Sequence, residues 1–303
     1  MASRIGQQLG NYQLIQLLGK GNFAEVYLGG HIHLGTLAAV KVLNTHLMDV
    51  NAFRTEARII AHLIHPHIVR ILEFGIEDQA PFLVMDFAPY GTLRQRHPKG
   101  TMVPLLMVVG YVKQVADALQ YAHDERLVHR DVKPENILVG RRNEVLLSDF
   151  GIALLAQSSH DQQPYNTAGT MLYMAPEQIR GRPCPASDQY SLGIVVYEWV
   201  CGRCPFMGTS PMEVALKQLS EPPQLLRDSV PSISPAVEQV VMRVLAKDPE
   251  ERFESVQDFA AALEQASLLD DSGLSAQPAP SIEQQLPPIP PSGLPDDTLP
   301  TLP

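Results

Sequence analysis

A polar cluster between two apolar stretches has the residue types of a metal-dependent catalytic site. It reads VHRDVKPEN over residues 128–136 and is followed by LSDFG over residues 147–151. Asp131 and Asn136 fall in one short loop and Asp149 begins another, so two carboxylates and an amide oxygen can converge on Mg2+ ions, which prefer oxygen ligands. A structural core seldom buries so many charged groups. The pattern therefore indicates catalysis.

A glycine-containing turn near the N-terminus is the second candidate. Residues 19–26 read GKGNFAEV and lie between two expected strands. Glycines lack side chains, so their backbone amides can approach a phosphate closely. By itself the pattern is weak, because a pair of glycines between strands more often forms just a tight hairpin. Because a strand rather than a helix follows the turn, the sequence argues against a dinucleotide-binding fold.

Lys41 is a cation inside the otherwise apolar strand AAVKVL, residues 38–43. A buried ammonium is costly unless it is paired. Glu56, on the polar face of the next expected helix, is an available counter-ion. The alternative is a lysine on an edge strand that faces water.

The elements that position these residues change type along the chain. Alternating or continuous apolar residues predict strands, and apolar residues at helical spacing predict helices. The expected strands are 12–18, 24–32, 36–43, 68–76 and 80–87, with one helix at 51–64 that ends before Pro66. The expected later helices are 106–125, 187–202, 211–221, 235–246 and 255–265. A region rich in strands is therefore followed by a helical region.

Composition narrows the class of protein. The chain has 303 residues, of which 45% are hydrophobic, and a net charge of -10 that should repel nucleic acid. The longest apolar run, Leu192 to Cys201, is too short to span a membrane and contains Glu198. No secretory signal opens the sequence, and three cysteines suit a reducing compartment. We therefore expect a cytoplasmic chain with no membrane span and no nucleic-acid partner.

The C-terminal part has a different composition. The last Lys or Arg is Arg252, and nine prolines lie between Pro278 and Pro303. Such a segment cannot form regular hydrogen-bonded structure, so we expect residues 265–303 to be an acidic, Pro-rich, disordered tail. The tail is either a linker to a further sensor domain or a segment that docks into aromatic grooves.

Taken in order, the motifs resemble those of bacterial serine/threonine protein kinases of the eukaryotic type. They are the glycine loop, Lys41, Glu56, HRDVKPEN, DFG, Ala175-Pro176-Glu177 and Ser187-Asp188. The resemblance covers residues 12–264 and leaves 1–11 as an N-terminal extension. It implies an α+β, two-lobed protein kinase fold. The N-lobe (12–85) is a small antiparallel sheet with one regulatory helix, 86–88 form the hinge, and the C-lobe (89–264) is mainly helical.

The resemblance also implies roles for individual residues. Asp131 accepts the proton of the substrate hydroxyl, Lys133 steadies the γ-phosphate, and Lys41 holds the α- and β-phosphates while pairing with Glu56. Asn136 and Asp149 hold Mg2+, with Mn2+ as an alternative metal. The implied ATP-binding residues are Leu18, Gly19, Lys20, Gly21, Val26, Ala39, Lys41, Met85, Asp86 and Ala88. Ala24 departs from the family pattern, because a third glycine is usual there.

Other residues match structural and regulatory positions of the family. Glu177 resembles the ion-pair partner of Arg252, and Asp188 resembles the anchor of the catalytic loop. Arg130 implies activation by a phosphate on the segment 149–177, for which the candidates are Thr167, Ser159 and Ser158. Such modification implies a transient homodimer for trans-autophosphorylation.

The implied partners are proteins that carry Ser or Thr, and Ile152 favours Thr. The alternative is a pseudokinase that binds nucleotide or partners without turnover. Loss of Lys41, Asp131, Asn136 or Asp149 would favour that reading, and all four are present.

Overall fold

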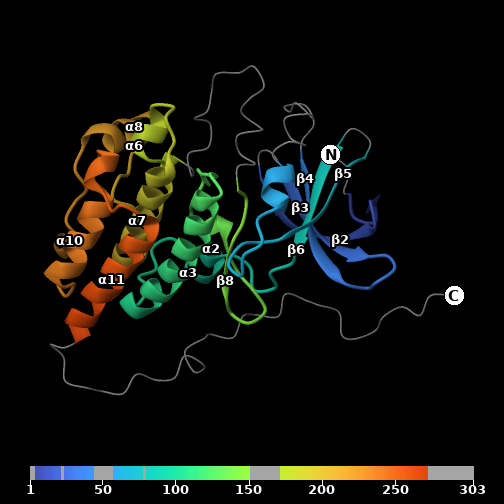
Figure 1. Ribbon diagram of the computed structural model, residues 1–303, viewed down its shortest axis with the longest axis horizontal. Helices are drawn as coiled ribbons and strands as arrows, with labels where there is room; N and C mark the ends of the chain where they lie inside the picture. The colour runs from blue at the N-terminus through green and yellow to red at the C-terminus, as the bar shows by residue number, and fades with distance from the viewer. Residues whose placement is uncertain (1–3, 22–23, 44–56, 78–79, 151–170, 272–303) are drawn as a thin grey trace.

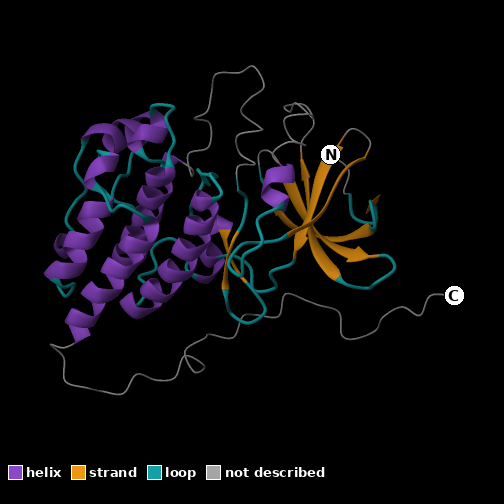
Figure 2. Ribbon diagram, viewed as in Figure 1, coloured by secondary structure: helices purple, strands orange, loops and turns teal. Residues whose placement is uncertain are grey.

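A computed structural model describes residues 4–21, 24–43, 57–77, 80–150 and 171–271 (Figure 1). Glu56, Ile152, Ser158, Ser159 and Thr167 lie outside these ranges. Strands gather at one end of the molecule and helices at the other (Figure 2). The expected α+β arrangement of a sheet-rich part followed by a helical part is confirmed.

The N-terminal part is a six-stranded antiparallel sheet in the order β1-β2-β3-β4-β6-β5. Its strands are β1 (Gln8–Leu9), β2 (Tyr12–Lys20), β3 (Ala24–His31), β4 (Leu37–Leu43), β5 (Ile71–Glu77) and β6 (Ala80–Asp86). All five expected strands are present. β1 was not expected: it pairs with β2 and buries Leu9 completely, so part of the extension 1–11 belongs to the sheet.

The two faces of this sheet pack against different cores. Val40, Val42 and Val84 join one apolar cluster with the N-terminal strands. Leu43, Leu83 and Met85 join the larger core, which includes Ala57 and Ile60 from the helical turn at 57–61. Because side chains alternate along a strand, Lys41 belongs to the face of Leu43 and Met85.

The helical part surrounds one buried helix. Its elements are α2 (Leu93–Arg96), α3 (Leu105–Asp124), α6 (Pro176–Ile179), α7 (Pro185–Cys201), α8 (Pro211–Ser220), α9 (Leu226–Ser229), α10 (Pro235–Val244) and α11 (Val256–Asp271), with the hairpin β7 (Ile137–Val139) and β8 (Val145–Leu147). Every residue of α7 from Ser187 to Val200 is buried. The five expected helices are present. The four-residue helices α2, α6 and α9 were missed because one turn is too short to show a periodic pattern.

The expected start of the tail at residue 265 is wrong. α11 continues to Asp271, and Ala266 and Ser267 are buried at 4% and 3% exposure. They extend the buried stripe that contains Leu263. The prolines that prevent regular structure begin only at Pro278, so the helix has room to continue.

No helix within the described ranges is long and apolar enough to cross a membrane.

The expected pair of Glu177 and Arg252 is confirmed. Arg252 Nη1 and Nη2 donate to Glu177 Oε1 and Oε2 at 2.8 and 2.9 Å, and Ser187 Oγ donates to Oε1 at 2.7 Å. Both side chains are buried. Burial would raise the pKa of Glu177, but the hydrogen bonds and charge of Arg252, with Ser187, hold it below its ordinary value. The pair fastens α6 to the segment before α11.

We predict that Glu177→Gln lowers the free energy of unfolding at pH 7 by about 3 kcal/mol, because it leaves the Arg252 guanidinium buried without its counter-charge. Denaturant titration measures this loss. Lys113→Met is the control, since its pair with Glu264 is exposed and should be worth less than about 1 kcal/mol.

Glu177→Gln should also remove the contribution of this carboxyl to the pH dependence of the free energy of unfolding. A carboxyl whose folded pKa lies below its unfolded value stabilises the fold above that unfolded pKa, about 4.3, and ceases to do so as the pH falls through the folded pKa. Wild type and Glu177→Gln should therefore converge in stability in acid. A constant difference down to pH 2 would contradict this account.

Candidate active site

Lys41 is nearly buried and is paired across the two parts of the molecule. Its side chain lies on β4, the residue is 9% exposed, and Nζ lies 2.7 Å from Asp149 Oδ1. The sequence-based argument that this ammonium needs a counter-charge therefore holds, with Asp149 as the described partner. Pairing with Glu56 stays a prediction, because that residue lies outside the described ranges.

The loop before β7 presents Asp131 with its carboxylate held by two neighbours. Lys133 Nζ donates to Oδ1 and Oδ2 at 2.9 and 2.7 Å. Asn136 Nδ2 donates to Asp131 Oδ2 at 2.9 Å and to its backbone oxygen at 2.8 Å. These contacts close the loop on itself, so the spacing in HRDVKPEN has a direct structural reason.

Asp149 is joined to this loop through its neighbour. Ser148 donates to the Asn136 backbone oxygen from N at 2.9 Å and from Oγ at 3.0 Å. Burial would raise the pKa of Asp149, but Lys41, with smaller contributions from His129 and Lys133, lowers it below its ordinary value. The carboxylate is therefore ionised at neutral pH and can hold a cation.

The donor set fits Mg2+. Because Asn136 Nδ2 is committed to Asp131, its Oδ1 is the atom left for a ligand, and Asp149 adds an ionised carboxylate. Among the described residues, no group of three or more His, Cys, Asp or Glu side chains could hold a metal on its own. Mg2+ usually binds through one or two protein oxygens together with substrate phosphates and water. Asn136 and Asp149 suit that mode.

Asp188 fixes the loop from the core, as expected. Its carboxylate, which is fully buried on α7, accepts from the backbone N of His129 at 2.8 Å and of Arg130 at 2.7 Å. It also lies 2.8 Å from His123 Nε2. Arg130 has φ +69°, a strained conformation for a side chain of this size, and these hydrogen bonds maintain it.

The His129 ring is in contact with Phe150 beside the loop that carries Asp131. The rings of His129 and Phe150 have centroids 4.5 Å apart, and His129 Nε2 lies 2.8 Å from the Ser148 backbone oxygen. Ile60, Ile71 and Phe150 contribute to the same core. Segments that are far apart along the chain therefore meet in this core.

One buried centre was not expected from the sequence. Arg94 on α2 donates to Glu135 Oε1 at 2.9 Å and to both carboxylate oxygens of Glu198 at 2.9 Å, and it also contacts the Tyr173 hydroxyl. Tyr173 Oη donates to Glu198 Oε2 at 2.6 Å. Burial would lower the pKa of Arg94, but these acids raise it. The available signal was Glu198, a carboxylate within an apolar run that had to be paired.

The sheet register gathers the expected nucleotide-binding residues. Val26 is paired with both Gly19 on β2 and Lys41 on β4, and Ala39 is paired with Met85. Paired residues of neighbouring strands share a face. Val26, Ala39 and Met85 therefore line the same side of the sheet as Lys41.

The glycine turn itself is partly described. Gly21 N donates to Ala24 O at 2.8 Å, and Lys20 Nζ lies 2.8 Å from Glu25 Oε1. Ala24, the departure from the usual glycine, is buried in the core. Leu18 is partly exposed on β2.

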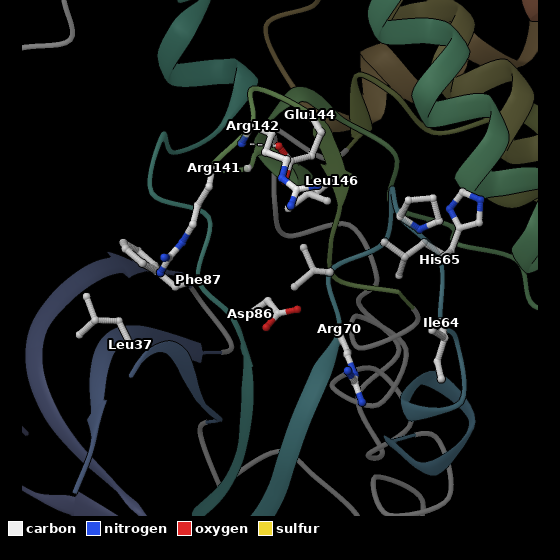
Figure 3. A pocket seen from close by; sticks show the side chains of 14 residues that line it. Leu37, Ile64, His65, Arg70, Asp86, Phe87, Arg141, Arg142, Glu144 and Leu146 are labelled. Atoms are coloured by element: carbon white, nitrogen blue, oxygen red, sulfur yellow. Dashed lines mark hydrogen bonds between the residues drawn. The ribbon is translucent and has the colours of Figure 1, made fainter. Parts of the chain in front are cut away.

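The expected hinge begins within a strand. Asp86 is the last residue of β6, pairs with Ala38, and donates its amide to Arg70 O at 3.0 Å. Its side chain lies on the face opposite to Lys41 and lines a cavity of about 440 Å3 (Figure 3). Ala88 is buried just after the strand.

Comparison with known proteins agrees with this geometry. A family model described as protein kinase domain matches residues 12–264. Serine/threonine-protein kinase Pkn1 of Myxococcus xanthus is 38% identical over 90% of this chain and 40% of its own length. PrkC of Bacillus subtilis is 35% identical over 86% of this chain and 41% of its own length. PknB of Mycobacterium leprae is 38% identical over 83% of this chain and 42% of its own length.

The chain thus spans about two fifths of the length of these three relatives, all of which are named serine/threonine-protein kinases. The domain match covers most of the sequence, and it begins at the first long strand and ends within α11. The chain therefore belongs to the protein kinase family.

Proposed function

We propose that this chain transfers the γ-phosphoryl group of ATP to Ser or Thr hydroxyls of proteins. The observation that carries the proposal is the placement of Asp131 between Lys133 and Asn136, in a loop joined through Ser148 to the Lys41–Asp149 ion pair. A pseudokinase would not need all four motif residues in this arrangement. The names of the relatives support serine and threonine as the acceptors.

The chain's own residues act mainly by positioning and by charge. Asp131 accepts the proton of the acceptor hydroxyl as its oxygen attacks the γ-phosphorus, and the leaving group is ADP. Lys133, already in contact with Asp131, faces the transferring group. Lys41 holds the α- and β-phosphates. Because the transition state carries charge on its oxygens, fixed cations stabilise it without having to reorganise.

The nucleotide would lie against the sheet face that carries Lys41. The residues proposed to line its site are Leu18, Gly19, Lys20, Gly21, Val26, Ala39, Met85, Asp86 and Ala88. Protein kinases generally use ATP with Mg2+, and Asn136 and Asp149 are the residues that would hold the metal, with Mn2+ as an alternative. When bound, the metal offsets negative charge on the phosphate oxygens.

We predict that Lys41→Met and Asp131→Asn each lower the rate of phosphoryl transfer at least about 100-fold, because one loses a phosphate ligand and the other the proton acceptor. Radiolabelled ATP with a generic protein substrate provides the assay. Lys113→Met, which removes an exposed lysine of α3, is the matched control. Near wild-type transfer by either active-site variant, with its fold intact, would show that the assignment is wrong.

Regulation should involve the segment that follows Asp149. Arg130 Nε is buried and has no hydrogen-bond partner among the described residues, so this donor is available to an anion. We propose phosphorylated Thr167 as that anion, with Ser158 and Ser159 as the other candidates. Since each copy would modify another, the initial rate of autophosphorylation per enzyme should rise with protein concentration.

We predict that Thr167→Ala lowers turnover about tenfold, equivalent to about 1.4 kcal/mol, and that adding Arg130→Ala causes little further loss. Phosphopeptide mapping of the active chain should find the modification at Thr167. If the losses of turnover add fully in the double variant, Thr167 and Arg130 act independently. If mapping finds no phosphate on the segment, the proposed regulation by phosphorylation is wrong.

Acceptor choice is proposed to depend on Ile152, which follows Asp149-Phe150-Gly151. A β-branched side chain is stiff, and in this family such residues accompany a preference for Thr. We predict higher kcat/KM for a Thr peptide than for its Ser counterpart, with the preference moved toward Ser by Ile152→Phe. Equal or faster turnover of the Ser peptide by wild type would contradict this role.

A further inference from the structure

A groove of about 440 Å3 lies where the two parts of the molecule meet (Figure 3). Its walls come from four segments that are far apart in the sequence. They are the start of β4 at Leu37, the loop at 64–70, the end of β6 with Phe87, and the β7–β8 turn at 140–146. We call it the back groove. Because both parts of the molecule contribute, an occupant would contact them simultaneously.

The back groove shares only Asp86 with the proposed nucleotide site, and the Asp86 side chain lies on the face of the sheet opposite to Lys41. Asp86 on β6 is paired with Ala38 on β4. The Ala38 side chain belongs to the apolar cluster that also contains Val40 and Val84, which is the cluster on the sheet face opposite to Lys41. Lys41 and Met85 lie on the other face, as alternation along β4 and β6 requires. A ligand in the back groove would therefore leave the phosphate-binding side free.

Three arginines give the groove an excess of positive charge. Arg70, Arg141 and Arg142 line it, and the structure gives none of their guanidinium groups a hydrogen bond or ion pair with another described residue. Asp86 lies between Arg70 and Arg141 at its centre (Figure 3). The second acid, Glu144, already accepts the Arg142 backbone N–H at 2.6 Å and so closes the turn.

A local excess of positive charge is unusual in a chain whose net charge is -10. All three cations are arginines, whose planar groups can bind a carboxylate with two parallel hydrogen bonds. Beside them stand apolar side chains: Leu37 and Leu146 are partly exposed, and Ile64 is 68% exposed. The groove thus offers cationic and apolar contacts side by side.

The exposure of the charged groups in the back groove indicates whether its ligand is a small molecule or a peptide. Arg70, Arg141 and Arg142 are all exposed, so they stay hydrated and each contact is weak. Small-molecule sites bury most of their ligand, which this rim would not do. An extended peptide can instead make several weak contacts at once.

We propose that the back groove binds a peptide segment of protein substrates in which acidic and apolar residues alternate. This inference rests on the proposed function, because it takes the partner to be a substrate. Binding there would keep the substrate near Asp131 and raise its effective concentration. It should therefore lower KM and leave kcat unchanged.

Binding is tested on the full chain with a fluorescein-labelled peptide of alternating Asp and Leu, followed by fluorescence anisotropy. We expect saturable binding that weakens with salt, and no binding of a matched Asn–Leu peptide. Arg141→Glu should raise Kd about tenfold, equivalent to 1.4 kcal/mol. Arg227→Glu, an exposed arginine on α9 with the same change in net charge, should alter Kd less than about twofold. Equal effects of the two variants would overturn the site.

The chain's own acidic C-terminal segment is the competing occupant. Asp296→Asn with Asp297→Asn, made in the full chain, removes the paired acids of that segment. Unchanged affinity for the probe supports a partner in trans. Tighter binding would show that this segment competes for the groove, and would overturn the assignment to substrates.

Transfer assays separate this inference from the proposed function. A Thr acceptor peptide is joined through a Gly-Ser linker to either the Asp–Leu or the Asn–Leu segment. We expect a lower KM for the acidic form, equal kcat values, and loss of the difference in Arg141→Glu. Equal KM values overturn substrate docking even where the probe binds. If neither peptide is phosphorylated, the proposed activity fails, and the docking of substrates fails with it.

Discussion

Buried polar groups on α7 must be paired, and this requirement organises the helical part of the molecule. A carboxylate without water is stable only where donors surround it. The Asp188 carboxylate accepts hydrogen bonds from the backbone of the catalytic loop. Ser187 donates a hydrogen bond to Glu177 of the Glu177–Arg252 pair. Glu198 is paired with Arg94 and Tyr173. Each pairing fixes a segment that has little regular structure of its own. The helix is therefore the frame on which the loops around Asp131 are built.

A short ion pair is one of the contacts that join the loop around Asp149 to the sheet. Asp149 is held on the catalytic loop through Ser148 and Asn136, and it meets Lys41 at 2.7 Å. Lys41 in turn is fixed by the register of β4 with β3 and β6. A chain of contacts thus runs from α7 to the face of the sheet that carries Lys41. Because Lys41 keeps the pKa of Asp149 low, the same contact that joins the two parts also preserves the charge that a metal needs.

The long elements and the motif residues could be predicted from sequence, because both depend on local patterns. Period-2 and helical spacing located five strands and five helices, and the motif order placed Lys41, Asp131 and Asp149 together. The features that were not predicted correctly depend on contacts between segments that are distant in the sequence. β1 exists because Leu9 fills the core, and α11 outlasts its expected end because Ala266 and Ser267 are buried. Arg94 could not be assigned, since its three partners come from separate segments that only the fold brings together.

The alternation of side chains along β4 and β6 gives one strand pair two different surfaces. Ala39, Lys41 and Met85 face the proposed nucleotide site, whereas Ala38 and Asp86 face away from it, with Asp86 in the back groove. A slip of one residue in this register would exchange the two sets, so the strand pairing specifies both surfaces at once. Residues in the groove can therefore change without placing a different side chain beside Lys41. This separation would allow the proposed choice of partner to vary while the groups proposed to carry out transfer stay constant.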